Sequence, residues 1–362
     1  MTHTTERHTE IDEPIFLLAS ERSGTNMTRA ILGAHPNIAA PTSPHLLMNF
    51  RPEVSCYGDL EVDRNFRRLC DDVCTVLDQQ LGAWEAEIAP HEIFEEAPGR
   101  SFAAAFDYVY RRERDAVGAG RMFFKENEAF FHFEYLLRNY PDARFIYLVR
   151  DGRDMVLSYR NSLSHFGTIE DGAEVWRDEQ RACLRLAADP TLRDRILPIH
   201  YEDILAFPEE SVREICEFVG EQFHPDMLDF HKKKSNKKAA DSVHSWDNIS
   251  SPIMRSNYGK YRDGFTDREL RKIESIMWRE LFQAGYPLEN SRESYNDSGG
   301  LGEVVSKGWK FIRQVVGRRE MMDPDEFLMR RKRVQVFGEM HQSLETEHME
   351  PLLTCRTLST PN

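Results

Sequence analysis

Short apolar runs and amphipathic stretches alternate along residues 14–287 of the chain. Compact apolar runs are typical of buried parallel strands, and they occupy residues 15–19, 121–125, 144–149 and 196–201. Pro198 weakens the last of these predictions, because proline cannot donate a ladder hydrogen bond. Between the runs, as over residues 61–81, apolar side chains return every three or four positions and predict amphipathic helices. Strands that alternate with helices predict an open, mainly parallel α/β sheet.

Capping residues mark where two of the later helices begin and end. Pro208 is suited to open a helix, and Gly220 is suited to stop it. Thr266 and Glu269 have the spacing of a capping box, and Gly285 follows the apolar pattern of that helix as a C-cap. The sequence therefore predicts one helix between Pro208 and Gly220 and another between Thr266 and Gly285.

The chain divides into three parts by pattern. Residues 14–287 carry the strand and helix alternation, with a helical insertion at 50–120 that is suited to form a cap over a site. Residues 288–302 are predicted as a linker, because Ser, Gly and Asn are frequent there. Residues 303–362 form a charged, partly amphipathic tail that we expect to be helical and to which the sequence assigns no role.

Composition excludes several classes of protein. The formal net charge of −14 argues against a nucleic-acid binder, which needs an excess of Lys and Arg. No apolar run approaches the length of a membrane span, and the first ten residues lack the features of a signal peptide. The six cysteines show no paired CxxC spacing, so we expect a reducing cytoplasm. Cys70 and Cys74 lie one helical turn apart, where core packing is a better interpretation than a metal site.

A polar turn follows the first predicted strand and leads directly into a helix. Backbone N–H groups at such a place bind anions, because the helix dipole adds positive potential. Arg22 adds a charge, Gly24 permits a tight turn, and hydroxyl and amide donors come from Ser23, Thr25 and Asn26. No lysine follows the glycine, which disfavours an ATP- or GTP-hydrolysing loop. Taken alone, the segment is equally compatible with a capped turn that binds nothing.

A second basic segment follows the third predicted strand. Arg150 stands at the end of that strand, and Ser158 lies eight residues later, near the start of a helix. An arginine fork and a hydroxyl so placed could grip one phosphate together. The alternative is that Arg150 and Arg153 form surface ion pairs with Asp151 and Asp154. Because ligands bind beyond the carboxyl ends of parallel strands, we expect this segment, Arg22 and Lys125 to converge.

Together, three segments resemble the sulfotransferases that use 3′-phosphoadenosine 5′-phosphosulfate (PAPS). RSGTNMTRAILGAHPNI resembles the 5′-phosphosulfate loop, above all of tyrosylprotein and related bacterial types, which is close to RSGTTxxRxxLxxHP. RFIYLVRDGRDMVLSY resembles the 3′-phosphate strand and helix, typically xxIYLVRDPRDVxxSY, and IHYEDILAFPEESVREICEFVGEQF resembles a later strand and helix. The resemblance covers residues 14–287 and implies a P-loop-like open parallel sheet flanked by helices. It also implies an enzyme that transfers a sulfuryl group from PAPS to an acceptor hydroxyl or amine.

The resemblance implies a role for each matching residue. The 5′-phosphosulfate would be held by Arg22, Ser23, Gly24, Thr25 and Asn26, and the 3′-phosphate by Arg150 and Ser158. Lys125 matches the lysine of a KDP or KTP sequence, which lies beside the sulfuryl group and the leaving phosphate. Arg22 and Lys125 would then stabilise developing charge in an in-line displacement.

The sequence departs from the family pattern at several of these positions. Glu21 stands for a commoner glycine, and we expect its charge to point away from the loop. Asn26 replaces threonine, Gly152 replaces proline, and Glu126-Asn127 replaces Asp/Thr-Pro.

The general base is the missing part of the pattern. Relatives place a glutamate where this chain has Thr42 or Ser43, and neither can serve. His45 matches a histidine that often follows that glutamate, and its ordinary pKa suits proton transfer near neutral pH. His200 and Glu126 are the rival candidates.

Other charged segments have weaker interpretations. Lys260, with Arg255, stands where relatives bring a Gly-Lys-aromatic element over the nucleotide, and a solvated turn is the alternative. The lysine run 232–238 is predicted as a solvated loop, which could also attract an acidic acceptor. No cluster of ligands stands at the spacing of a metal site. The acceptor itself, whether a small molecule, lipid, saccharide or peptide, has no motif.

Two other functions remain open at this stage. The first is a kinase-like nucleotide phosphotransferase, against which the absent loop lysine counts. The second is a non-catalytic nucleotide-binding member of the family, which the absent glutamate suggests and the retained Arg22, Lys125, Arg150 and Ser158 oppose.

Overall fold

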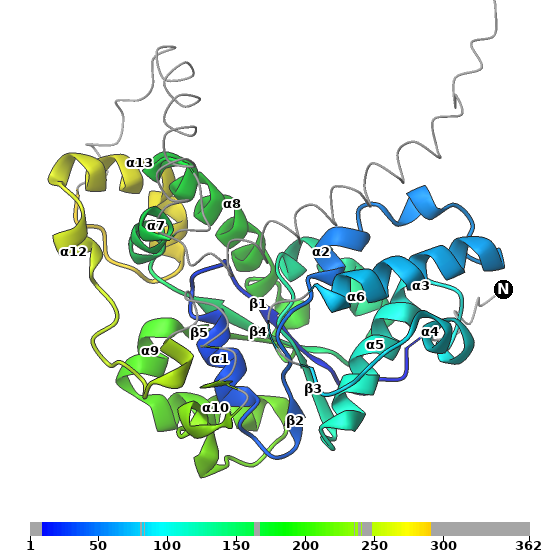
Figure 1. The fold of residues 1–362 in the computed structure, drawn as a ribbon. Helices are drawn as coiled ribbons and strands as arrows, with labels where there is room; N and C mark the ends of the chain where they lie inside the picture. The colour runs from blue at the N-terminus through cyan, green and yellow to red at the C-terminus, as the bar shows by residue number, and fades with distance from the viewer. Residues whose placement is uncertain are drawn as a thin grey trace, which may run out of the picture.

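Five parallel strands form a single sheet with helices on both faces (Figure 1). The computed structural model describes residues 9–290 except 80, 81, 83, 163–166, 235, 238, 239 and 241–247. The predicted linker from 291 on and the tail 303–362 lie outside the described residues. In spatial order the strands are β2 (Ile38–Ala39), β3 (Arg121–Phe124), β1 (Ile15–Leu18), β4 (Arg144–Val149) and β5 (Ile196–His200).

Four of the five strands were predicted from apolar runs. The fifth, β2, is too short to give a run and follows the turn after the first helix, so the pattern missed it. Pro198 is compatible with β5 because β5 is an edge strand of the sheet, where one row of hydrogen-bonding groups needs no partner strand. The predicted open parallel α/β sheet is therefore confirmed.

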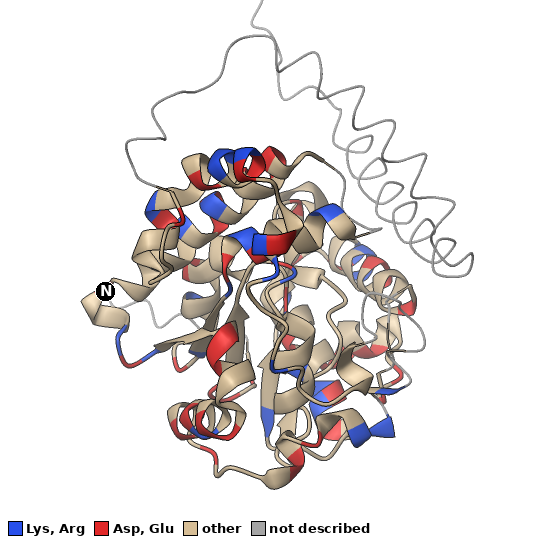
Figure 2. Ribbon diagram, turned by 90° about the vertical axis from the view of Figure 1, so that its left-hand side faces the viewer, with Lys and Arg blue, Asp and Glu red and all other residues tan. Residues whose placement is uncertain are grey.

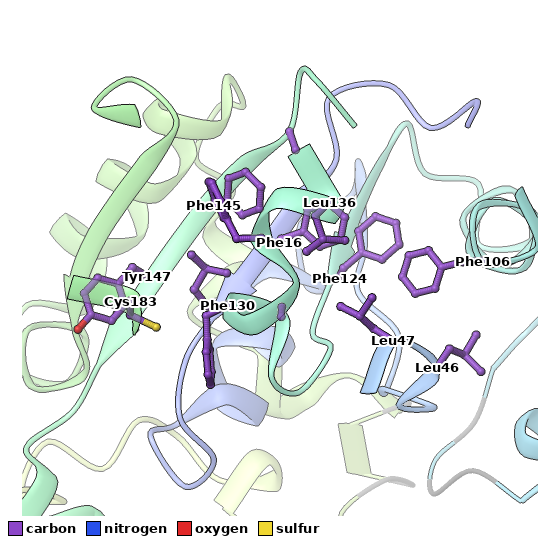
Figure 3. Close-up of a cluster of buried hydrophobic side chains, with 14 of the residues drawn as sticks. Phe16, Leu46, Leu47, Phe106, Phe124, Phe130, Leu136, Phe145, Tyr147 and Cys183 are labelled. Carbon is purple, nitrogen blue, oxygen red and sulfur yellow. The ribbon is translucent and has the colours of Figure 1, made fainter. Parts of the chain in front are cut away.

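Each strand contributes side chains to two separate cores. Phe16 and Leu18 of β1 join a large core on one face, and Ile15 and Leu17 join a smaller core on the other. In the large core the rings of Phe16 and Phe124 stack with centroids 4.5 Å apart (Figure 3). This alternation follows from the period of two along a strand.

The smaller core lies under helices α1 (Thr25–Leu32), α9 (Tyr201–Ala206) and α10 (Pro208–Val219). Helices α7 (Gly152–Asn161), α8 (Ile169–Ala187) and α13 (Asp267–Gln283) cover part of the opposite face, as Figure 1 shows. Pro208 begins α10, and Gly220 follows it with a φ of 79°. Thr266 and Glu269 form the predicted capping box of α13.

Residues 50–120 are largely helical and pack beside β3. Helix α3 (Asp63–Asp78) lies within the predicted 61–81 and contacts α4 (Pro90–Glu96), which contacts α5 (Phe102–Ala116). Cys70 and Cys74 are buried in the large core, as the packing interpretation predicted. The remaining elements are α2 (Leu46–Phe50), η1 (Val54–Tyr57), η2 (Ala129–His132), α6 (Phe133–Asn139), η3 (Pro190–Leu192), η4 (Pro225–Met227), η5 (Phe230–Lys232) and α12 (Tyr261–Gly264).

Within the part of the chain that the structure describes, no helix combines the length and the apolar character that crossing a membrane requires. The described cysteines are all free thiols. Acidic and basic residues are interspersed along the helices (Figure 2).

A buried ion pair joins α7 to α13. Arg153 is fully buried, and its guanidinium contacts Asp151 Oδ2 at 2.7 Å and Glu274 Oε1 at 2.6 Å. The sequence had offered surface pairs for Arg150 and Arg153 as an alternative. For Arg153 the expected surface location is wrong, because Arg153 and its ion pairs lie in the interior. Arg150 bonds main-chain carbonyls instead.

We predict that Glu274→Ala lowers the free energy of unfolding by about 3–5 kcal/mol, because it leaves the Arg153 charge buried beside a single partner. Urea unfolding measures this change. Arg213→Ala, which breaks an exposed pair with Glu209 at 2.7 Å, serves as the control and should cost no more than about 1 kcal/mol. Equal losses in the two variants would contradict a structural role for the buried pair.

Candidate active site

The turn between β1 and α1 forms the centre of the site. Arg22 and Gly24 both adopt left-handed backbone conformations, with φ of 63° and 90°. A Cβ atom at Gly24 would lie 2.4 Å from the ring of Tyr201, so only glycine fits there. Helix α1 has no side-chain N-cap and no acidic residue in its first turn. Its first N–H groups therefore keep the anion-binding potential of a helix N-terminus.

Arg150 extends from the end of β4 toward this turn. Its Nη1 donates to the Arg22 carbonyl at 2.8 Å, and its guanidinium lies 4.6 Å from the centroid of the Tyr201 ring. Ser158, in α7, accepts a hydrogen bond from Arg22 Nε at 3.2 Å. The structure thus brings the two predicted anion-binding segments into direct contact.

These residues line one cavity of about 300 Å³ at the carboxyl edge of the sheet. The predicted site residues in its lining are Arg22, Gly24, Thr25, Asn26, Arg150, Ser158 and Lys260. Ser23 lies between two of them in sequence, and its Oγ is buried with no hydrogen-bond partner among the described residues. Arg255 is exposed and is not part of the lining.

The loop that carries Lys260 is held in place by Asp154. Asp154 accepts hydrogen bonds from Gly259 N at 2.5 Å and Tyr261 N at 2.9 Å. Burial raises the pKa of Asp154, while these two bonds and the Arg150 charge oppose that rise. Lys260 is consequently fixed at the mouth of the cavity although its side chain is exposed.

Sequence reasoning missed Tyr201 and Asn257 as site residues. Asn257 Nδ2 donates to the Tyr201 hydroxyl at 2.9 Å, and both residues line the cavity. Tyr201 directly follows β5, so the rule that selected Arg150 after β4 could have selected it. Asn257 gives no such signal, because no predicted strand precedes it.

Lys125 follows β3 and lies outside the lining of this cavity. Its Nζ donates to Asn127 Oδ1 at 3.1 Å. Asn127 in turn donates from Nδ2 to Glu21 Oε1. Glu21 therefore engages the residues that follow β3.

His45 lies just before α2, in a left-handed backbone conformation with a φ of 61°. Its Nδ1 lies 3.4 Å from Ser43 Oγ, and Ser43 Oγ donates to Glu126 Oε1 at 3.1 Å. Glu126 is 4% exposed and accepts further bonds from Tyr110 and from Leu47 N. Burial raises the pKa of Glu126, and these donors oppose the rise. A carboxylate so enclosed is poorly placed to meet an acceptor directly.

His200 is at the end of β5 but belongs to a different environment. Its Nε2 lies 2.8 Å from the Ala284 carbonyl oxygen, and its ring meets Tyr286 edge-on. It is not part of the cavity lining. These contacts correspond to a histidine satisfied at the edge of the sheet.

The lysine run contacts neighbouring surface groups where it is described. Lys232 pairs with Asp229 at 2.8 Å, and Lys233 donates to the Gly33 carbonyl at 2.6 Å. No group of His, Cys, Asp and Glu that could hold a metal ion occurs among the residues that the structure covers.

Comparison with known proteins identifies relatives of this chain. Protein-tyrosine sulfotransferase 2 of Gallus gallus is 24% identical over 279 residues, which cover 72% of this chain and 66% of that protein. Protein-tyrosine sulfotransferase 1 of Danio rerio is 23% identical over 295 residues, which cover 78% of this chain and 74% of that protein.

A solved structure shares the fold. The sulfotransferase domain from the curacin biosynthetic pathway superimposes with a TM-score of 0.55 at 17% identity and covers 77% of this chain and 100% of that domain. A family model described as the sulfotransferase family matches residues 14–225, which is more than half of the 362 residues. Together with the anion-binding turn and the Arg150 segment, this match shows that the chain belongs to the sulfotransferase family.

Proposed function

We propose that this enzyme uses PAPS as its sulfuryl donor and transfers the group to an acceptor hydroxyl or amine. One observation carries the choice of donor. Ser23 Oγ and Arg150 Nε are buried and have no hydrogen-bond partner among the described residues. Buried polar groups without partners are costly, so both atoms fit a ligand with anionic oxygens. They lie at two segments that meet at one cavity, as a ligand with two anionic ends requires.

The residues of the cavity fit the two ends of PAPS. Arg22, Ser23 and the N-terminus of α1 would hold the 5′-phosphosulfate, with Thr25 and Asn26 as further donors. Arg150, Ser158 and Lys260 would hold the 3′-phosphate. When bound, PAPS supplies an activated sulfuryl group whose transfer releases 3′,5′-ADP.

The catalytic contribution of the chain is positioning and charge. Lys125 would place its ammonium group where negative charge grows as the sulfuryl group leaves, supported by Arg22. His45 would accept the proton of the acceptor as the new bond forms. Its segment leads from β2 into the helices of the predicted cap, which we propose as the acceptor side of the site.

The acceptor class remains to be assigned by experiment. The names of the two animal relatives refer to protein tyrosine, so a tyrosine-containing peptide is the first acceptor to test. Phenols, hydroxylated lipids and saccharides belong in the same screen with labelled PAPS.

We predict that 3′,5′-ADP stabilises the protein well beyond AMP, because only 3′,5′-ADP offers a 3′-phosphate to Arg150 and Ser158. A ligand at a hundred times its Kd adds about 2.7 kcal/mol of stability, which thermal unfolding detects. Arg150→Ala should abolish most of the difference, and Arg213→Ala, at a residue outside the cavity lining, should keep it. Equal shifts from AMP and 3′,5′-ADP would remove the basis for the donor assignment.

We predict that Lys125→Ala lowers kcat by about 100-fold or more, while the affinity for 3′,5′-ADP changes little. The proposed charge acts mainly in the transition state, so its loss should appear in turnover. Steady-state kinetics and 3′,5′-ADP titration of the same preparation separate the two effects. Weakened binding with unchanged kcat would assign Lys125 to ground-state binding instead.

We predict that His45→Ala and His45→Gln each lower kcat by about 100-fold or more, with 3′,5′-ADP affinity retained, because general-base catalysis is typically worth 10²–10⁴-fold. His200→Gln is the matched control, because the His200 ring is engaged by the Ala284 carbonyl oxygen, 2.8 Å from Nε2, and by Tyr286, and its kcat should stay within about twofold. A loss below tenfold in both His45 variants would transfer the base role to another group.

A further inference from the structure

A chain of hydrogen bonds connects a buried carboxylate to the His45 ring. Glu126 Oε1 accepts from Ser43 Oγ at 3.1 Å, and Ser43 Oγ lies 3.4 Å from His45 Nδ1. Ser43 Oγ also accepts from the His45 backbone N–H at 3.0 Å. Ser43 is thus bonded to both the backbone and the ring of His45.

Both carboxylate oxygens of Glu126 accept hydrogen bonds. Tyr110, from α5, donates its hydroxyl to Oε1, and Leu47 N, at the start of α2, donates to Oε2 at 3.0 Å. Lys125 adds a nearby positive charge. The donors lower the pKa of Glu126 and so favour its ionised form, while burial acts in the opposite direction and raises that pKa.

The backbone of His45 is held as firmly as its ring. Leu46 and Leu47 of α2 are fully buried in the large core, where Figure 3 shows them near Phe124. Asn49 Nδ2 donates to the His45 carbonyl at 2.6 Å. These anchors keep His45 in a left-handed conformation that a residue other than glycine rarely adopts.

Counting protons on Ser43 fixes the tautomer of the imidazole. A serine hydroxyl has one hydrogen to donate and two lone pairs to accept with. The hydrogen points to Glu126, because a buried carboxylate is the stronger and nearer acceptor. One lone pair takes the His45 backbone N–H, and the other faces Nδ1. Only a proton on Nδ1 completes this arrangement, which leaves the lone pair of the ring on Nε2.

We propose that Ser43 and Glu126 are positioning residues that hold His45 as the Nδ1–H tautomer, with Nε2 as the basic nitrogen that takes the proton of the acceptor. The second half of this proposal rests on the proposed function of His45 as the general base. The pair compensates for the glutamate that the family pattern places at Thr42 or Ser43. The carboxylate is that of Glu126, in the segment after β3, and it acts on His45 through the Ser43 hydroxyl.

The tautomer can be measured without activity. In protein labelled with 15N-histidine, long-range 1H–15N correlation distinguishes Nδ1–H from Nε2–H at a pH where the imidazole is neutral. Comparison with His45→Gln assigns the His45 signal among the 13 histidines. We expect Nδ1–H in the wild type and a shift toward Nε2–H in Ser43→Ala. Ser275→Ala is the matched control, because it removes a serine hydroxyl of α13 that donates to the Lys272 carbonyl at 2.7 Å and leaves the Ser43 contact in place. An Nε2–H ring in the wild type would overturn the proposal, since the hydroxyl would then point away from Glu126.

Kinetics test the consequence for catalysis. Ser43→Ala and Glu126→Gln should lower kcat by about 10- to 100-fold, as the loss of a partner that orients a functional histidine does elsewhere, with KM for the donor little changed. Ser43→Thr, which retains the hydroxyl, should recover activity, and Ser275→Ala, whose hydroxyl contacts the Lys272 carbonyl, should retain it. Thermal unfolding of each variant separates misfolding from a local effect.

The two measurements distinguish the two ideas. If Ser43→Ala changes the tautomer of His45 but not kcat, the positioning role of Ser43 stands and His45 is refuted as the base. A tautomer that stays at Nδ1–H in both Ser43→Ala and Glu126→Gln would refute the positioning, whatever the activity of His45→Ala.

Discussion

The cavity at the carboxyl edge of the sheet depends on the close packing of the Tyr201 ring against Gly24. No side chain at position 24 could coexist with this ring, since its Cβ would lie 2.4 Å from two ring carbons. The same ring carries the Arg150 guanidinium at 4.6 Å, and its hydroxyl accepts from Asn257. One aromatic side chain therefore sets the spacing of three segments that are far apart in sequence. Their relative positions decide whether two anionic groups of one ligand can be held at once.

The elements that could be predicted are those whose signals are local. An apolar run fixes a strand, and a charged residue directly after it fixes one position at the carboxyl edge of the sheet, as for Arg150 after β4. Strand β2, with two residues, carries no such signal. The contact between Ser43 and Glu126 joins residues 83 positions apart, and the contact between Asn257 and Tyr201 joins residues 56 apart. Contacts of this kind follow from tertiary packing, which periodicity does not describe.

Two of the departures from the family pattern, Gly152 and Asn127, have contacts that explain them. Gly152 lies so close to Trp176 and Met277 that a Cβ would be 2.6 Å from the indole and 2.7 Å from the sulfur. Packing by α8 and α13 thus fills the place of the usual proline. Asn127 accepts from Lys125 and donates to Glu21, so that the replacement of a proline supplies a partner for the unusual glutamate. Glu21 and Asn127 are therefore two departures in direct contact, and Gly152 is fitted to its neighbours.

The most consequential departure concerns where the carboxylate lies. A glutamate at Thr42 or Ser43 would face the acceptor and could take its proton directly. In this chain the carboxylate of Glu126 is enclosed by Tyr110, Ser43 and the N-terminus of α2, and burial raises its pKa against the influence of those donors. Such a group can orient a neighbour through a hydrogen bond, but it has no open side for a substrate. If His45 is the base, proton transfer passes to a group whose ordinary pKa lies near neutral pH, and turnover should become sensitive to pH in a range where a glutamate base would already be fully ionised. On this proposal, the exchange of a carboxylate base for an oriented imidazole would change the pH range in which the enzyme works and leave the residues that line the cavity unchanged.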